Sequence, residues 1–205
     1  MALSQDCRSH QDGLCKEKGV PPLVRLLRGS RTTERTLLCV IQALGALCIG
    51  VAHTSNINSQ MAIAEEKAIP TLLELLKHHR SLQVKVLVAQ TLACVMLGNQ
   101  ELQVTIMNQG EFTYNHVLQL LHAQDQSISL EAGYALSLFA YNNKVQQALI
   151  LQTGGISIAA YEPFLESESE THRAKAAFQI HMQEKYTHMR LLFLPVSSQT
   201  WTRCP

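Results

Sequence analysis

The sequence predicts an all-α solenoid made of three-helix repeats, each about 44 residues long. Two Leu-rich patterns carry this prediction, because both recur along the chain with nearly the same period. The composition points the same way: 46% of the 205 residues are hydrophobic but only 5% are aromatic, a balance that favours helices over a β-sandwich. We expect about three full repeats, with truncated repeats at the two ends.

The first pattern is a Leu-rich block that opens with proline in its two clearest copies. It reads PPLVRLL at 21–27, PTLLELL at 70–76, HVLQLL at 116–121 and, most weakly, YEPFL at 161–165. The last leucines of these blocks lie 49, 45 and 44 residues apart. Because proline is tolerated in the first turn of a helix, each block predicts the second helix of a repeat.

The second pattern follows each block and is rich in alanine and leucine. It reads VIQAL at 40–44, VAQTL at 88–92, AGYAL at 132–136 and AAFQI at 176–180, and the copies end 48, 44 and 44 residues apart. Leu87, Thr91 and Val95 continue one copy with a spacing of four residues. This spacing predicts an amphipathic helix, the third and longest of each repeat.

A short first helix is predicted ahead of three of the blocks, at 11–18, 100–108 and 144–152. Glycines separate first from second helices, namely Gly19, Gly110, Gly154 and Gly155. We expect these glycines to adopt the left-handed backbone that ends a helix. A polar insertion at 51–58 accounts for the longer first spacing.

These boundaries divide the chain into six segments. They are a partial repeat at 1–18, repeats at 19–66, 67–109 and 110–154, a truncated repeat at 155–183, and a tail at 184–205 that matches no repeat. The tail predicts an alternative carboxy-terminal end on a shortened array. Solenoids need polar capping repeats, so ends without caps predict a sticky surface and marginal stability.

The period, the Leu-Val-x-Leu-Leu block at 23–27 and the Ala/Leu stripe together resemble the armadillo repeat. The resemblance covers about 12–182 and is best at 19–47. It implies a right-handed superhelix whose third helices line a concave face. In relatives such as importin-α and β-catenin that face binds extended peptides through a ladder of Asn side chains flanked by Trp.

Neither binding position of those relatives keeps its residue type in this chain. The Asn positions fall at Ala46, Cys94, Leu138 and Met182, and the Trp positions fall at Gln42, Gln90, Tyr134 and Phe178. An Asn amide offers both a donor and an acceptor to a peptide backbone, whereas the Ala, Cys, Leu and Met at the Asn positions offer essentially none. We therefore do not expect a backbone clamp of the importin type, or a nuclear-import receptor.

What remains is a groove that turns from polar to aromatic along the array. We predict that it binds a peptide or helical segment of a protein partner. Its predicted partner-binding residues are Gln42, Gln90, Tyr134, Leu138 and Phe178. Tyr and Phe supply rigid contact area. The alternative is that Tyr134 and Phe178 only fill space between neighbouring third helices.

Enzyme and cofactor patterns are absent from the sequence. The six cysteines contain no CxxC pair, so a zinc site is not expected. Gly45 and Gly50 have the spacing of a phosphate-binding loop, but Val51 and Ala52 stand where Lys and Ser/Thr are needed. The formal net charge of +1 argues against nucleic-acid binding driven by bulk charge. We expect a non-enzymatic chain with no cofactor and no metal.

The compartment is predicted to be intracellular, either cytoplasmic or nuclear. The first residues lack the basic and apolar regions of a signal peptide. The uncharged run at 37–52 is shorter than the roughly 20 residues that span a membrane, so a buried helix is favoured. Membrane association through this run, or through the apolar tail at 191–196, is the less favoured interpretation.

The predicted function is therefore protein–protein interaction, as a scaffold or adaptor segment. Two alternatives stay open besides membrane association. The first is the substrate-recognition part of a ubiquitin-ligase system, since armadillo repeats often accompany such domains. The second is a truncated product without function of its own.

Overall fold

The computed structural model describes residues 7–108, 112–156 and 160–186. Within these ranges, the side chains of Phe178 and of the residues beyond Ile180 are not described. The described chain consists of helices joined by turns and loops, with one isolated β-bridge between Ile49 and Ser55. The helices, in order, are α1 Arg8–Lys16, α2 Val20–Arg28, α3 Glu34–Cys48, the 3-10 turn η1 Val51–His53, α4 Ile57–Glu65, α5 Ala68–His78, α6 Leu82–Met96, α7 Gln100–Asn108, α8 Asn115–Leu121, α9 Gln126–Ala140, α10 Lys144–Gln152, α11 Glu162–Leu165 and α12 Glu170–Tyr186.

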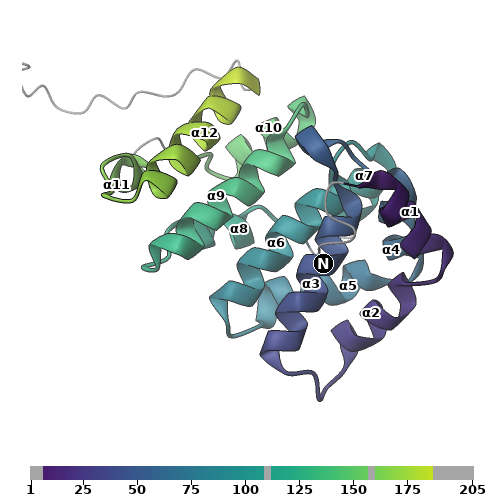
Figure 1. Ribbon diagram of the computed structural model, residues 1–205. Helices are drawn as coiled ribbons and strands as arrows, with labels where there is room; N and C mark the ends of the chain where they lie inside the picture. The colour runs from purple at the N-terminus through teal and green to yellow at the C-terminus, as the bar shows by residue number, and fades with distance from the viewer. Residues whose placement is uncertain (1–6, 109–111, 157–159, 187–205) are drawn as a thin grey trace, which may run out of the picture.

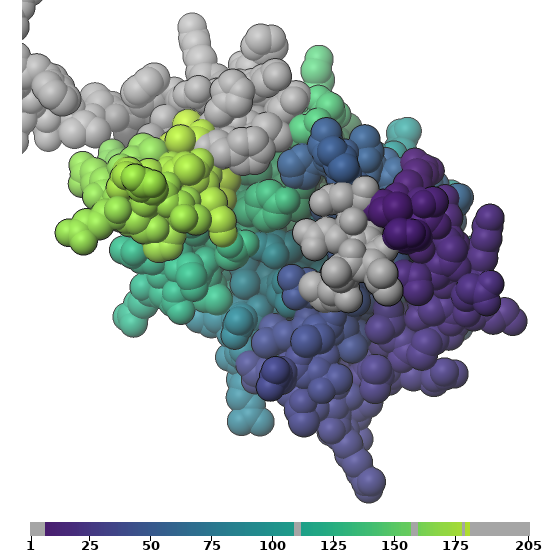
Figure 2. All heavy atoms as spheres, viewed as in Figure 1, coloured from purple at the N-terminus to yellow at the C-terminus, as the bar shows by residue number. Residues whose placement is uncertain are grey.

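These helices follow one another in triplets, and the predicted all-α solenoid is confirmed. The long third helices α3, α6, α9 and α12 lie side by side as one layer (Figure 1). In the space-filling view of the same face, atoms of α6 lie between those of α3 and α9 (Figure 2). The short helices predicted at 100–108 and 144–152 are α7 and α10. The six predicted segments have their boundaries between first and second helices. This division stays a prediction, because the helices stack without a break that would mark such boundaries.

A single hydrophobic core runs through the first three triplets. The central third helix, α6, contributes most to it, since its residues are buried on both sides by α3 and α9. The predicted stripe on α6 includes Val95, which is fully buried, and Thr91, whose Oγ1 donates to the backbone oxygen of Ile41 at 3.0 Å. A second, small core joins the last triplet to α9 and is made of Leu130 of α9 with Tyr161, Phe164 and Ala176.

Most of the uncharged run at 37–52 lies in a helix that packs into the core, as the sequence favours, while residues 49–52 leave the helix for a β-bridge and the turn η1. Helix α3 ends at Cys48, and its buried residues include Leu37, Ile41 and Leu44. Within the described ranges, no helix is both long enough and apolar enough to cross a membrane. The apolar tail at 191–196 lies outside the described residues.

Left-handed glycines were expected at the junctions between first and second helices, and at the first junction this expectation is wrong. Gly19 has φ −70°, and the left-handed residue there is Lys18, with φ 54°. Lys67, with φ 56°, holds the same place before α5. Gly19 is required for a different reason, because a Cβ atom there would lie 2.9 Å from the backbone oxygen of Leu14. Gly154 and Gly155 do have positive φ, while Gly110 lies outside the described residues.

An amide ladder of asparagines and glutamines joins successive triplets. Its members are Asn56, Asn99 and Asn143, each at the start of a first helix, and Gln11, Gln60 and Gln103 on the preceding first helices. Each asparagine Nδ2 donates to the glutamine Oε1 of the triplet before, at 3.0, 3.2 and 2.8 Å. Each asparagine Oδ1 accepts a backbone N–H three residues later, which caps the helix.

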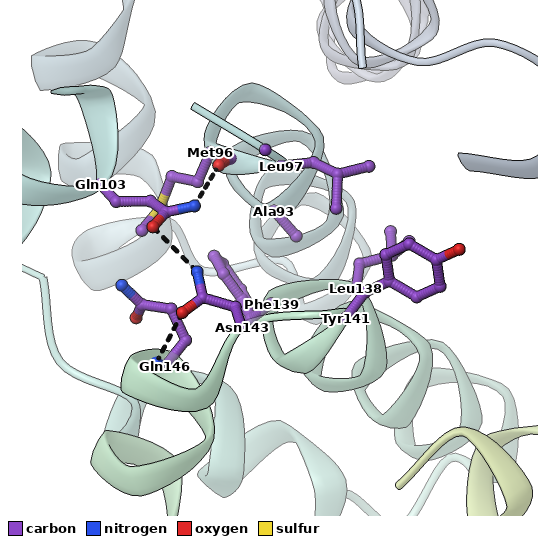
Figure 3. Close-up of a pocket in the computed structure, with 10 residues that line it drawn as sticks. Ala93, Met96, Leu97, Gln103, Leu138, Phe139, Tyr141, Asn143 and Gln146 are labelled. Atoms are coloured by element: carbon purple, nitrogen blue, oxygen red, sulfur yellow. Dashed lines mark hydrogen bonds between the residues drawn. The ribbon is translucent and has the colours of Figure 1, made fainter. Parts of the chain in front are cut away.

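The glutamines complete the ladder at the ends of the third helices. Gln60 Nε2 donates to the backbone oxygens of Cys94 and Leu97, both at 2.9 Å. Gln103 Nε2 donates to the backbone oxygen of Met96 at 2.7 Å, between α6 and Asn143 (Figure 3). Carbonyls that the helix cannot satisfy itself are therefore bound by the neighbouring element.

Candidate functional site

The layer of third helices places the predicted partner-binding residues in different environments. Gln42 on α3 is exposed, while Gln90 on α6 and Tyr134 on α9 are half-buried. Phe178 lies on α12, but its side chain is outside the described part of the structure. Leu138 is 3% exposed and belongs to the hydrophobic core, so it offers almost no surface to a partner. Leu138 therefore does not line the groove as expected, because its side chain packs between helices.

A polar network crosses three of the third helices. Gln90 Nε2 on α6 donates to Glu131 Oε2 at 2.6 Å and to the Glu131 backbone oxygen at 3.1 Å. Lys175 Nζ on α12 donates to Glu131 Oε1, also at 2.6 Å. The Lys175 and Glu131 side chains are 48% and 35% exposed, so this pair contributes at most about 1 kcal/mol. Its clearer effect is to fix the side chains of Gln90, Glu131 and Lys175 relative to one another across the layer of third helices.

Tyr134 is held by a residue that lies 81 positions earlier in the chain. Its hydroxyl lies 3.3 Å from His53 Nε2, and the two rings are tilted against each other with centroids 6.3 Å apart. The His53 ring also packs at 5.6 Å from that of Tyr141. His53 therefore reaches from the insertion after α3, past α6, to α9.

Burial favours the uncharged forms of both residues of this pair. It raises the pKa of Tyr134 to about 12, and the charges of Cys94 and Glu131 act in the same direction. Burial also lowers the pKa of His53 below its usual 6.5. A neutral imidazole and a neutral phenol can share one hydrogen bond, with donor and acceptor set by the tautomer.

A cleft of about 420 Å³ opens beside His53. Its walls are the 52–55 loop, Leu97 and Gly98 after α6, and the 141–143 segment after α9. Ala52, His53 and Asn142 have φ of 55°, 58° and 50°, which side chains other than glycine rarely adopt. Such backbone conformations are maintained only where the surroundings support them, and they cluster at functional sites.

Sequence reasoning missed His53 and the amide ladder for different reasons. His53 stands in an insertion without a counterpart in the other repeats, so no periodic signal identifies it. The ladder did leave a signal, because Asn56, Asn99 and Asn143 recur at 43 and 44 residues. The leucine and alanine patterns define the repeats without these amides, so they do not identify the ladder.

The thiols and carboxylates of the described residues do not gather into a metal-binding group of three or more. Cys48 and Cys94 are buried in the core. Burial raises the pKa of Cys94 to about 12 and that of Cys48 well above its usual value. Both thiols are therefore protonated at neutral pH and pack as small apolar side chains.

Comparison with known proteins gives two close relatives in sequence. The chain is 53% identical over 180 residues to the mouse ankyrin and armadillo repeat-containing protein, and 54% identical over 162 residues to the human one. These matches cover 88% and 79% of the chain, but only 12% and 11% of the relatives. No protein-family model matches the chain.

Solved structures with the same fold are armadillo-repeat proteins. A designed armadillo repeat protein in complex with the peptide (KR)4 matches 88% of this chain and 71% of its own, with a TM-score of 0.66 and 19% identity. The armadillo repeats only protein of Plasmodium falciparum matches 85% of this chain and 72% of its own, with a TM-score of 0.57 and 17% identity. At these identities the likeness concerns the fold alone.

Proposed function

Because the chain belongs to the armadillo-repeat proteins, we propose that it binds a protein partner along the face formed by its third helices. It acts there as a non-enzymatic scaffold or adaptor segment. Designed armadillo repeat proteins of the same fold are described as peptide-binding, one in complex with (KR)4 and another for modular peptide recognition. The observation that carries the proposal is the row of Gln42, Gln90 and Tyr134 on adjacent third helices, continued by the cleft beside His53.

The chemistry of this row favours recognition of side chains over recognition of a peptide backbone. Ala46 and Cys94 stand where an asparagine ladder would bind backbone amides, and neither can do so. Tyr134 offers a rigid ring that is partly accessible, and tyrosine is enriched at binding hot spots. The partner segment therefore packs an apolar side chain against Tyr134 and places polar groups near Glu131 and Lys175.

The test is affinity capture with mass spectrometry of bound proteins. It compares the native chain with the Gln90→Ala/Tyr134→Ala variant, after circular dichroism has matched their helicity. The control variant is Gln119→Ala/His122→Ala, which changes two exposed residues at and after α8. Partners recovered by the native chain and the control, but lost from the first variant, would support the third-helix face.

Two other outcomes would contradict the proposal. Recovery of the same partners by all three forms would move the binding surface away from Gln90 and Tyr134. Recovery of chaperones alone from all three would mean that the segment binds no partner by itself. Ubiquitin-transfer enzymes among the lost partners would assign the segment to substrate recognition in that system.

A further inference from the structure

A second surface lies along the edge where second helices connect to third helices. In Figure 1 the connections from α2 to α3 and from α5 to α6 lie along this edge, at the bottom of the view. We call it the basic edge, and its cations are Arg25, Arg28, Arg31, Arg35, Lys77, Arg80 and Lys85. Only two carboxylates, Glu34 and Glu74, lie in the same segments, 25–35 and 74–85. The chain as a whole carries +1, so positive charge is concentrated here.

Hydrogen bonds hold the two segments together. Ser81 Oγ donates to Glu34 Oε1 at 2.8 Å, across the two connections. Arg80 and Arg35 are the sequence neighbours of this pair, so the hydrogen bond joins the two segments that carry the cations. Lys85 Nζ donates to the backbone oxygen of Lys77 at 2.9 Å, which orders the α5–α6 side of the edge.

Three exposed arginines of this edge have no carboxylate partner among the described residues. Arg31, Arg35 and Arg80 are exposed and form no ion pair with any residue that the structure describes. Glu74 pairs with His78, at 3.8 Å. Arg28 Nη2 donates to the backbone oxygens of Glu66 and Lys67, at 2.8 and 2.7 Å, and not to a carboxylate.

A neighbouring histidine reports the same positive field. His116, at the start of α8, is half-buried next to the α5–α6 connection. Burial lowers the pKa of His116, and the charges of Lys77, Lys85 and His78 lower it further. Cations on α5 and α6 therefore act on a third element, α8, and the field extends along the edge over two repeats.

We propose that the basic edge binds an acidic segment of a partner protein, one rich in Asp and Glu. Guanidinium groups bind carboxylates through paired, charge-assisted hydrogen bonds, and three exposed arginines here lack carboxylate partners. The edge is separate from the third-helix row of Gln90 and Tyr134, so this inference does not depend on the proposed function.

A protein partner fits the edge better than a nucleic acid does. Glu34 and Glu74 interrupt the row of cations and would repel a continuous phosphate backbone, whereas a peptide can place its carboxylates on either side of them. The segments 25–35 and 74–85 also contain no Phe, Tyr or Trp on which bases could stack.

The test uses the full chain and a short fluorescent peptide of alternating Glu and Ser, with fluorescence anisotropy at low salt. The triple variant Arg31→Glu/Arg35→Glu/Arg80→Glu reverses the exposed charges of the edge. The control Lys16→Glu/Lys18→Glu/Lys144→Glu makes the same net charge change on other exposed residues. We expect the triple variant to bind at least about tenfold more weakly than the native chain and the control, and native binding to weaken with added salt.

Circular dichroism first establishes that all three forms have the same helicity. Equal affinity of the triple variant and the native chain would overturn the proposal, as would an equal loss in the control. Tighter binding of an oligonucleotide of equal charge would overturn the choice of a protein partner. A dimer of the native chain that the triple variant abolishes would assign the edge to self-association instead. The Gln90→Ala/Tyr134→Ala variant is expected to bind the acidic peptide normally, which separates this surface from the third-helix face.

Discussion

At the scale of single residues, Asn99 shows how the chain links one repeat to the next. It is 5% exposed, it caps α7 through Leu102 N–H, and it donates to Gln60 Oε1 at 3.2 Å. Gln60 cannot turn to compensate, because its Nε2 already binds the end of α6. Asn99→Ala is therefore expected to lower the free energy of unfolding by about 2 kcal/mol, from a lost cap and an unpaired buried acceptor.

Urea denaturation followed by circular dichroism measures this change. Asn115→Ala is the matched control, because Asn115 is exposed at the first position of α8. The control is expected to change the free energy of unfolding by less than about 0.5 kcal/mol. Equal effects of the two substitutions would mean that the amide ladder does not stabilise the solenoid.

Single residues also show what could be predicted from the sequence and what could not. The repeated blocks can be found in the sequence alone, and the short helices predicted ahead of two of them are α7 and α10. The left-handed turn at Lys18 did not, because lysine has no preference for that backbone and the neighbouring glycine was the expected choice. Burial of Leu138 and the contact between His53 and Tyr134 depend on how distant segments pack, which periodicity does not encode.

At the scale of helices, one glycine of α9 lies where that helix packs on the last triplet, and one glycine of α1 lies in open space. A Cβ atom on Gly133 of α9 would lie 2.8 Å from the Tyr161 hydroxyl oxygen and would clash with Gln179 Oε1. A Cβ atom on Gly13 of α1 would meet nothing within 4 Å. Alanine favours a helix over glycine by about 1 kcal/mol, so the two substitutions should act in opposite directions.

Gly13→Ala is expected to stabilise the chain by up to about 1 kcal/mol, whereas Gly133→Ala should loosen the packing of α12 on α9. Thermal unfolding gives the sign of each change, and hydrogen exchange locates the loosening. Exchange in α11 and α12 should rise for Gly133→Ala and stay unchanged for Gly13→Ala. A stabilised Gly133→Ala variant would show that Tyr161 and Gln179 make room for the methyl group.

At the scale of the whole molecule, two histidines make stability depend on pH. Burial is the main cause that lowers the pKa of both His53 and His116 from 6.5. The unfolded chain therefore binds protons at a pH where the folded chain does not. Their contribution to stability is complete above pH 6.5 and is lost as the pH falls towards the lowered values.

Urea midpoints at about pH 7.5 and pH 5.5 measure this loss. The native chain is expected to be less stable at the lower pH. His53→Gln and His116→Gln should each make that difference smaller, while His122→Gln, at an exposed position after α8, serves as the control. An unchanged difference in both variants would mean that other groups cause the pH dependence.

Stability should also differ between the middle of the solenoid and its last triplet. Apart from the contacts of His53 with Tyr134 and Tyr141, the repeats pack mainly on their neighbours, so the effect of a substitution depends on where it lies. Leu92 on α6 is fully buried in the main core, while Phe164 belongs to the small core of the last triplet. Leu92→Ala and Phe164→Ala should each cost about 3 kcal/mol locally.

Hydrogen exchange with mass spectrometry separates the two effects. Leu92→Ala is expected to raise exchange in α3, α6 and α9 together, because α6 packs on both of its neighbours. Phe164→Ala should raise exchange in α11 and α12 alone. Similar increases in α3 for both variants would mean that the last triplet unfolds only with the rest. If the last triplet does open by itself, Gln90 and Tyr134 remain on intact helices, and Phe164→Ala should leave partner binding at that face unchanged.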